Sequence, residues 1–161
     1  MITRIAFSTS KDSWISKIIR WFSNSTVSHC FFVYYDEDWK REMVLEATEG
    51  GFRIVPYSFY ENEVVKIFIP KYSIEEGLKQ SIDWLTEGYN YWGLFGMSWV
   101  ELGKWLKKKW KNPLRSSNTM FCSELIARVM MVSSYPGIED WDIQSIDPEM
   151  LMDFFEEEKG I

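Results

Sequence analysis

The sequence has very little of the two residue types that most often carry metal sites and disulfides. It contains one histidine, His29, and two cysteines, Cys30 and Cys122, in 161 residues. Two cysteines are too few for the disulfide framework of a small secreted domain. No apolar run approaches the roughly 18 residues of a membrane span, and the first eight residues lack the apolar core of a secretory signal. These absences favour a cytoplasmic protein with reduced thiols.

Positive charge is also scarce. Eighteen basic residues face 24 acidic ones, for a net charge of −6, which argues against a general nucleic-acid partner. The exception is the segment from Trp92 to Lys111, in which five lysines accompany Trp99, Trp105 and Trp110. Such a segment either touches an anionic membrane surface or packs on the core with a solvated lysine end. The second interpretation is favoured.

What the chain does contain is typical of a globular protein. Hydrophobic residues make up 46% and charged residues 26% of the sequence, a balance unlike that of disordered chains. The length fits one domain with a substantial core. No internal repeat or composition boundary divides the chain, so a single domain over residues 1–161 is expected.

Hydrophobic periodicity changes from strand-like to helix-like along the chain. Strands are expected at 3–8, 28–35, 43–48, 52–55 and 64–69, where β-branched and aromatic residues alternate. Apolar stripes at helical spacing indicate helices over 14–22, from Ser73 to about Leu85, over 92–110, from Cys122 to about Val132, and after Asp147. The pattern predicts an α+β domain, an antiparallel sheet with helices packed on it.

Cys122 and His29 are the residues best suited to chemistry. With Asn118 or Thr119 as N-cap, Cys122 falls in the first turn of its helix. There the helix dipole and free backbone N–H groups favour the thiolate. An imidazole on a neighbouring strand is the usual partner that takes the thiol proton. The sequence therefore predicts Cys122 as nucleophile and His29 as general base, against the alternative that Cys122 is a small buried hydrophobe.

The third candidate is Glu46, on the strand expected to return beside the His29 strand. Registers that pair Tyr35 with Lys40 or Glu42 put His29 and Glu46 on one face, directly opposite or diagonal. A register shifted by one residue would separate them. Ser123 and Glu124 lie beside the nucleophile, although Glu124 equally suits a first-turn dipole partner. The backbone N–H of Cys122 is a natural oxyanion donor, and no second donor is identified.

A zinc site is the competing interpretation of the same residues. His29, Cys30 and Cys122 are all metal-ligand types, but they lack the paired spacing of a zinc motif. Neighbouring strand residues point to opposite faces, so His29 and Cys30 are not expected to share an ion with Cys122. No metal and no cofactor is predicted.

Several short strings together resemble the permuted papain-like cysteine hydrolases, the circularly permuted NlpC-type group related to lecithin–retinol acyltransferase. They are Ser28-His29, Leu45-Glu46-Ala47 and Phe121-Cys122-Ser123-Glu124-Leu125, with the aromatic segment from Tyr89 to Leu94 before the last and Asp147 to Leu151 after it. The resemblance implies a permuted papain-like fold, Cys122 as nucleophile, His29 as base and Glu46 as the group that orients His29.

The resemblance indicates the type of reaction more narrowly than it indicates the substrate. Members of this superfamily split amides, including cell-wall peptide bonds, or transfer and hydrolyse acyl groups on lipids. The expected function is a cysteine peptidase or amidase that acts on a peptide or cell-wall peptide through a thioester. The alternatives are a lipid acyl hydrolase or acyltransferase at a membrane surface, and a non-catalytic module that binds a peptide or glycan.

Overall fold

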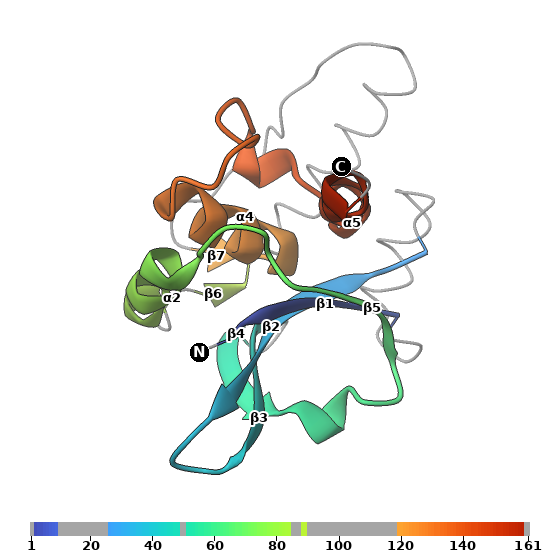
Figure 1. Ribbon diagram of the computed structural model, residues 1–161, viewed down its shortest axis with the longest axis vertical. Coiled ribbons are helices and arrows are strands. Elements are labelled where there is room, and N and C mark those ends of the chain that lie inside the picture. Colours follow the sequence, from blue (N-terminus) through green and yellow to red (C-terminus); the bar gives the residue numbers. More distant parts are fainter. Residues whose placement is uncertain (1, 10–25, 49–50, 85–87, 90–118, 160–161) are drawn as a thin grey trace.

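A five-stranded antiparallel sheet forms the centre of the fold, with strand order β4-β3-β2-β1-β5 (Figure 1). The computed structural model describes residues 2–9, 26–48, 51–84, 88–89 and 119–159. All five predicted strands are confirmed with small shifts of their ends. They are β1 (Arg4–Ser8), β2 (His29–Asp36), β3 (Arg41–Thr48), β4 (Gly51–Pro56) and β5 (Val64–Phe68). A short parallel pair that was not predicted, β6 (Gly88–Tyr89) with β7 (Thr119–Met120), forms a second, two-stranded sheet.

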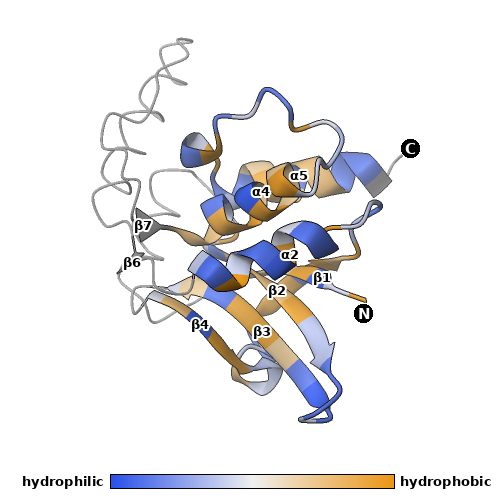
Figure 2. Ribbon diagram, turned by 90° about the vertical axis from the view of Figure 1, so that its left-hand side faces the viewer, coloured by the Kyte–Doolittle hydropathy of each residue, from blue (hydrophilic) through white to orange (hydrophobic). Residues whose placement is uncertain are grey.

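The described α-helices all lie on one side of the sheet (Figure 2). They are α2 (Glu75–Ser81), α4 (Cys122–Val132) and α5 (Pro148–Lys159), with short 3₁₀ turns η1 (Tyr57–Phe59), η2 (Ile82–Trp84) and η3 (Ile143–Ser145). This confirms the α+β class. The predicted helices over 14–22 and 92–110 fall outside the described residues. Within those residues, no helix has both the length and the apolar character needed to cross a bilayer.

Alternation along β2 divides the core between the two faces of the sheet. Cys30 and Phe32 face the helices and belong to the large cluster built around α4 and α5, which includes Cys122. Phe31 and Val33 face the other side, where they meet Ala6 and Val44 and are covered by residues of the β4–β5 connection. The predicted two-sided pattern of this strand is confirmed, and burial on both faces explains its nearly continuous hydrophobic run.

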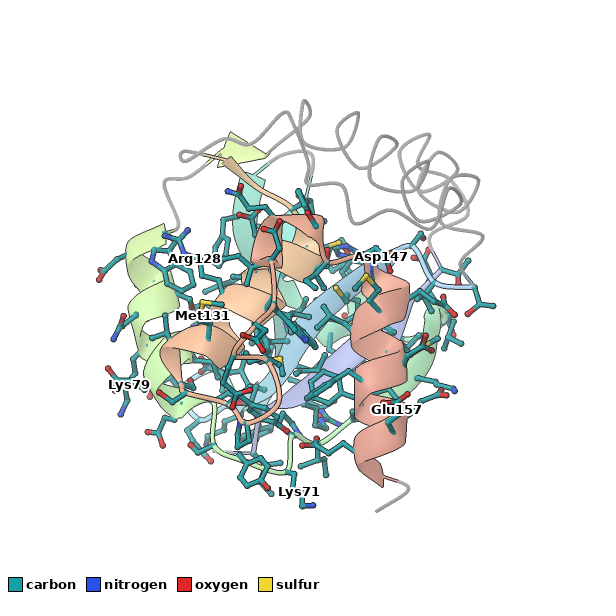
Figure 3. All side chains as sticks on the ribbon, turned by 90° about the horizontal axis from the view of Figure 1, so that it is seen from above. Lys71, Lys79, Arg128, Met131, Asp147 and Glu157 are labelled. Atoms are coloured by element: carbon teal, nitrogen blue, oxygen red, sulfur yellow. The ribbon has the colours of Figure 1, made fainter. Side chains whose placement is uncertain are left out.

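Helix α4 is more deeply buried than its one-sided stripe suggested, because α2 packs closely on it. A Cβ at Gly77 would lie 2.1 Å from the Val129 carbonyl oxygen, so only glycine allows this approach. Arg128 extends toward α2 (Figure 3), and its guanidinium lies 4.3 Å from the ring centroid of Trp84. This cation–π contact lets a charged side chain remain in a largely buried helix.

The predicted N-cap of α4 is wrong. Thr119 belongs to β7, and the N-cap position of α4 is Phe121, whose side chain caps nothing. Helix α2, expected from Ser73, has its N-cap position at Ile74, and the Ser73 hydroxyl accepts a hydrogen bond from the Glu75 N–H at 3.4 Å.

The predicted start of α5 is confirmed, with Pro148 in the first position and Asp147 before it (Figure 3). The Asp147 carboxylate accepts a hydrogen bond from the Met150 N–H at 2.8 Å. We expect Asp147→Ala to lower the free energy of unfolding by about 1 kcal/mol, because the N–H of Met150 in the first turn of α5 then loses this acceptor. Urea denaturation checks this, with the exposed Asp140→Ala as matched control. Equal loss in both variants would contradict the capping role.

Candidate active site

The ends of two elements meet at the candidate nucleophile. His29 is the first residue of β2 and Cys122 is the first residue of α4. The Cys122 side chain is buried, with 2% of the residue exposed, and its thiol and the His29 imidazole interact closely enough to shift each other's pKa. The predicted nucleophile and base are therefore brought together. The burial of Cys122 also fits the alternative that this residue is a small buried hydrophobe. A buried thiol beside an imidazole can in addition act as a nucleophile.

Glu46 holds the imidazole from the other side. The β2–β3 register pairs Tyr35 with Glu42, one of the two registers anticipated from the sequence, and it places Glu46 diagonal to His29 on the same face. The His29 Nε2 and Glu46 Oε2 atoms lie 2.6 Å apart. Because Nε2 contacts the carboxylate, Nδ1 is the ring nitrogen left for Cys122. Glu46 thus fixes the orientation of the ring.

Two residues that the sequence did not single out, Arg53 and Tyr60, also hold the Glu46 carboxylate in place. Arg53, directly opposite Glu46 in the β3–β4 pair, donates its Nε–H to Glu46 Oε1 at 2.8 Å. The Tyr60 hydroxyl lies 2.7 Å from Oε2 and 2.9 Å from Oε1. In the sequence, the consecutive glycines at 50 and 51 indicate a turn, from which the pairing of Arg53 with Glu46 could have been inferred. Tyr60 follows the η1 turn, whose path no sequence pattern specifies.

These contacts shift the ionisation of the site toward a charged pair. Burial alone would lower the pKa of His29, but hydrogen bonds and charge interactions with Cys122 and Glu46 raise it to about 10. A hydrogen bond from Cys30, and then hydrogen bonding and attraction from His29, hold the pKa of Cys122 well below its usual range despite burial. Both shifts favour a thiolate paired with an imidazolium.

The alternation argument against a shared zinc ion is not contradicted. Cys30 belongs to the core cluster on the helix side of β2, whereas His29 contacts Glu46 on the other face. Among the described residues, no three His, Cys, Asp or Glu side chains are arranged to hold a metal ion.

The residues beside the nucleophile have structural partners. The Ser123 hydroxyl donates to the Ile146 carbonyl at 2.6 Å, which ties α4 to the loop before α5. Glu124 is buried, at 3% exposure, rather than a solvated first-turn carboxylate. The backbone N–H groups of the first α4 turn have no helical acceptor and no side-chain cap. The Cys122 N–H therefore remains the candidate oxyanion donor.

Tyr60→Phe tests how firmly Glu46 is held. The change removes one hydrogen bond to a buried carboxylate and keeps the ring, which contacts Phe31 at a centroid distance of 4.6 Å. We expect the free energy of unfolding to fall by about 1.5 kcal/mol. Tyr57→Phe is the matched control, since the Tyr57 hydroxyl bonds to no described residue. A loss of similar size in the control would show that the Glu46 contact is not responsible.

An apolar cavity of about 480 Å³ lies between α2 and the sheet, away from the catalytic candidates. Neither Cys122, His29 nor Glu46 lines it. Its walls are mostly aliphatic and come from the N-terminus, β2 to β4 and α2; they include Ile2, Tyr34, Leu45, Ile54, Ile69 and Ile82. The cavity is of ligand size, but its walls hold none of the three candidates.

Comparison with known proteins adds a fold relationship only. No protein-family model matches the chain, and no curated protein matches it. Among solved structures, the fold is similar to the crystal structure of metalloprotein yiiX from Escherichia coli O157:H7, which carries the designation DUF1105. The TM-score is 0.57 with 19% sequence identity, over 97% of this chain and 81% of that chain. At this identity the likeness extends to the fold alone.

Proposed function

We propose that this chain is a cysteine-dependent hydrolase with a permuted papain-like fold, which cleaves an amide bond through a thioester. The observation that carries the proposal is the arrangement of Cys122, His29 and Glu46: the His29 imidazole lies 2.6 Å from the Glu46 carboxylate and interacts electrostatically with the buried Cys122 thiol. This is the arrangement of nucleophile, base and orienting group that nucleophilic catalysis requires. The family resemblance of the strings around these residues supports the same assignment.

Acylation follows from the charged resting state. The Cys122 thiolate attacks the carbonyl carbon, and the oxygen of the tetrahedral intermediate accepts a hydrogen bond from the Cys122 N–H. The imidazolium of His29 then gives its proton to the leaving nitrogen as the carbon–nitrogen bond breaks. An amine leaves, and the acyl group stays on Cys122 as a thioester.

Deacylation uses the same groups with His29 now neutral. The imidazole takes a proton from water, whose oxygen attacks the thioester carbonyl. Collapse of the intermediate expels the Cys122 thiolate and releases a carboxylic acid, which restores the thiolate–imidazolium pair. Glu46 stays ionised throughout and stabilises the imidazolium.

The substrate proposed first is a peptide or cell-wall peptide. A lipid acyl ester is the alternative within the same chemistry, and a binding module that keeps the fold without turnover is the alternative outside it. The similar yiiX structure is titled a metalloprotein. We include no metal here, because the described residues offer no cluster of three suitable ligands.

Trapping of the acyl-enzyme tests the proposal. The protein is incubated with peptide amides and with short- and long-chain acyl esters, quenched in acid and analysed by intact and peptide mass spectrometry. We expect acyl mass on Cys122 from the amides, and none in Cys122→Ala. Adducts from long-chain esters alone would replace the amidase by the lipid hydrolase. No adduct from any donor, with an ordinary thiol at Cys122, would contradict the hydrolase and favour the binding module.

A further inference from the structure

The apolar cavity between α2 and the sheet has no part in the proposed mechanism. Its volume is about 480 Å³, and seven of the 14 residues that line it are isoleucine or leucine. Water in such a cavity finds few polar partners, whereas an apolar ligand removes the aliphatic walls from water. The volume is also in the range of small-molecule pockets. The cavity is therefore suited to an aliphatic ligand.

One wall of the cavity is the apolar stripe that α2 continues into η2. The helix packs against α4 through Gly77, which lies against the backbone of Val129. The stripe of Ile74, Leu78 and Ile82 lines the cavity, and α2 lies over β2 to β4, which form the other wall (Figure 2). Such a stripe normally packs on the core, yet Ile82 is 60% exposed. The end of the stripe is therefore incompletely covered by the described part of the chain.

Isoleucines from three other segments open onto the same cavity. Ile2 is 72% exposed, Ile69 65% and Ile54 40%, and all three line the cavity. They lie far apart in the sequence, so it is the fold that gathers them. Single exposed apolar residues are normal on a protein surface, but a group of them around one cavity is typical of a binding site.

Two charged side chains stand at the exposed rim of the cavity. The Lys79 Nζ and Glu75 Oε1 atoms lie 2.9 Å apart, and about two thirds of each side chain is exposed. Both residues line the cavity. A hydroxyl group can accept a hydrogen bond from the ammonium and donate one to the carboxylate. A carboxylate ligand would be repelled by Glu75, and an ammonium ligand by Lys79. The rim is therefore complementary to an uncharged hydroxyl.

We propose that this cavity binds a ligand with one long aliphatic chain and an uncharged hydroxyl head. The chain lies between α2 and the sheet, and the hydroxyl bonds to the Glu75–Lys79 pair. A concave site of this size fits one small molecule, and the net charge of −6 disfavours an anionic bilayer. Cys122, His29 and Glu46 do not line the cavity. The site is thus separate from the proposed active site and does not depend on the proposed function.

Chain length and head group give the first test. Alkan-1-ols from hexanol to dodecanol are titrated below their solubility limits, and binding is measured by isothermal titration calorimetry. We expect one molecule to bind per protein chain, with a Kd that falls about fourfold for each added methylene. At neutral pH the alcohol should bind more tightly than the carboxylate or the ammonium of equal chain length, because neither Glu75 nor Lys79 repels it.

Substitutions that fill the cavity locate the bound chain. Ile54→Trp fills it from β4 and Ile82→Trp from η2. Each should weaken dodecanol binding by at least about tenfold, because the alcohol loses two or more buried methylenes. Val65→Trp is the matched control, since Val65 is a half-exposed strand residue outside the cavity, and its Kd should change by less than about twofold. Cys122→Ala should bind as wild type does. Near-ultraviolet circular dichroism confirms that each variant is folded.

A dodecanol that carries a photoreactive diazirine provides a measurement that needs no variant. Mass spectrometry of labelled wild type should find the label on peptides from α2, η2 or β4. Absence of saturable binding would overturn the inference, and so would binding that survives in both Ile54→Trp and Ile82→Trp. Binding that is lost in Cys122→Ala, with label on α4, would place the chain in the proposed active site instead. Binding to phosphatidylcholine vesicles without binding of the free alcohols would replace the cavity ligand by a membrane surface.

Discussion

Replacing His29 with alanine is expected to raise the pKa of Cys122 toward that of an ordinary thiol and to remove most turnover. Without the imidazolium, the buried sulfur loses a charge partner and a hydrogen bond. A thiol of pKa near 8.5 is only about 1% ionised at pH 6.5. The leaving group also loses its proton donor, which is typically worth about 10²–10⁴-fold in rate. We expect kcat/KM to fall within that range or beyond it.

The pH profile of the wild type follows from the same pair. Activity rises with pH as Cys122 ionises, well below the usual thiol range. It falls again as His29 loses its proton near pH 10. In His29→Ala the alkaline limb should disappear, because no imidazolium remains to titrate. The thiolate absorbance in the ultraviolet and the pH dependence of kcat/KM measure the two limbs separately.

The matched control for this change is His29→Gln, which keeps a hydrogen-bonding group beside Glu46 but carries no charge. It should resemble His29→Ala in thiol ionisation while retaining more stability. A low ionisation midpoint that survives in both variants would show that His29 does not stabilise the thiolate. The catalytic assignment would then be wrong even if Cys122 proved reactive.

The strands were predictable because the pattern that indicates them depends only on neighbouring residues in the sequence. Along β2, side chains on both faces are buried, so the run from Cys30 to Val33 contains only large or apolar residues. The observed pairing of Tyr35 with Glu42 is one of the β2–β3 registers considered from the sequence. For that register, parity puts Glu46 on the face of His29, whereas the register shifted by one residue, which the sequence left open, would have separated them.

The parts of the site that escaped prediction depend on contacts between distant elements. Nothing in the sequence around Tyr60 indicates that the η1 turn carries its hydroxyl to Glu46. Strand alternation correctly put Cys30 and His29 on opposite faces of β2, but it gave no information on which face the helices cover or on where α4 begins relative to β2. Cys122 could therefore be assigned to a first turn, whereas its contact with both His29 and Cys30 could not be foreseen.

Charge balance connects these separate contacts. The site holds two anions, Glu46 and the Cys122 thiolate, and two cations, His29 and Arg53. Buried charges are tolerated when they are paired and fully hydrogen-bonded. Because His29 lies between the two anions, removal of either anion is expected to lower the pKa of the imidazole.

Replacing Glu46 with alanine is accordingly expected to give the largest loss of stability among these variants. The Glu46 side chain is fully buried and contacts His29, Arg53 and Tyr60. Its removal leaves a largely buried imidazolium and a buried hydroxyl without their acceptor. Breaking a buried charge pair costs roughly 3–5 kcal/mol. We expect about 3 kcal/mol, because Arg53 is half-exposed and regains water. Urea denaturation near pH 7 measures the difference.

The pH dependence of stability separates the charge of Glu46 from its volume. Burial alone would raise the pKa of this carboxyl, but hydrogen bonds and attraction from His29, with Tyr60 and Arg53, lower it. The stabilisation is thus present above the unfolded-state value of about 4.3 and is lost as pH falls through the lower folded value. Glu46→Gln keeps the shape and removes the titration. Its stability should therefore decline less between about pH 5 and pH 3 than that of wild type.

Parallel acid curves for wild type and Glu46→Gln would contradict this account, since they would mean that the folded carboxyl ionises like the unfolded one. The role of Glu46 in catalysis is read separately, from the alkaline limb of kcat/KM. Glu46 helps to raise the pKa of His29, so Glu46→Gln should move that limb to lower pH. A structural role alone would lower the amount of folded protein and leave the limb in place. A shifted limb in a fully folded Glu46→Gln protein would therefore identify Glu46 as the residue that positions the catalytic imidazole and keeps it charged.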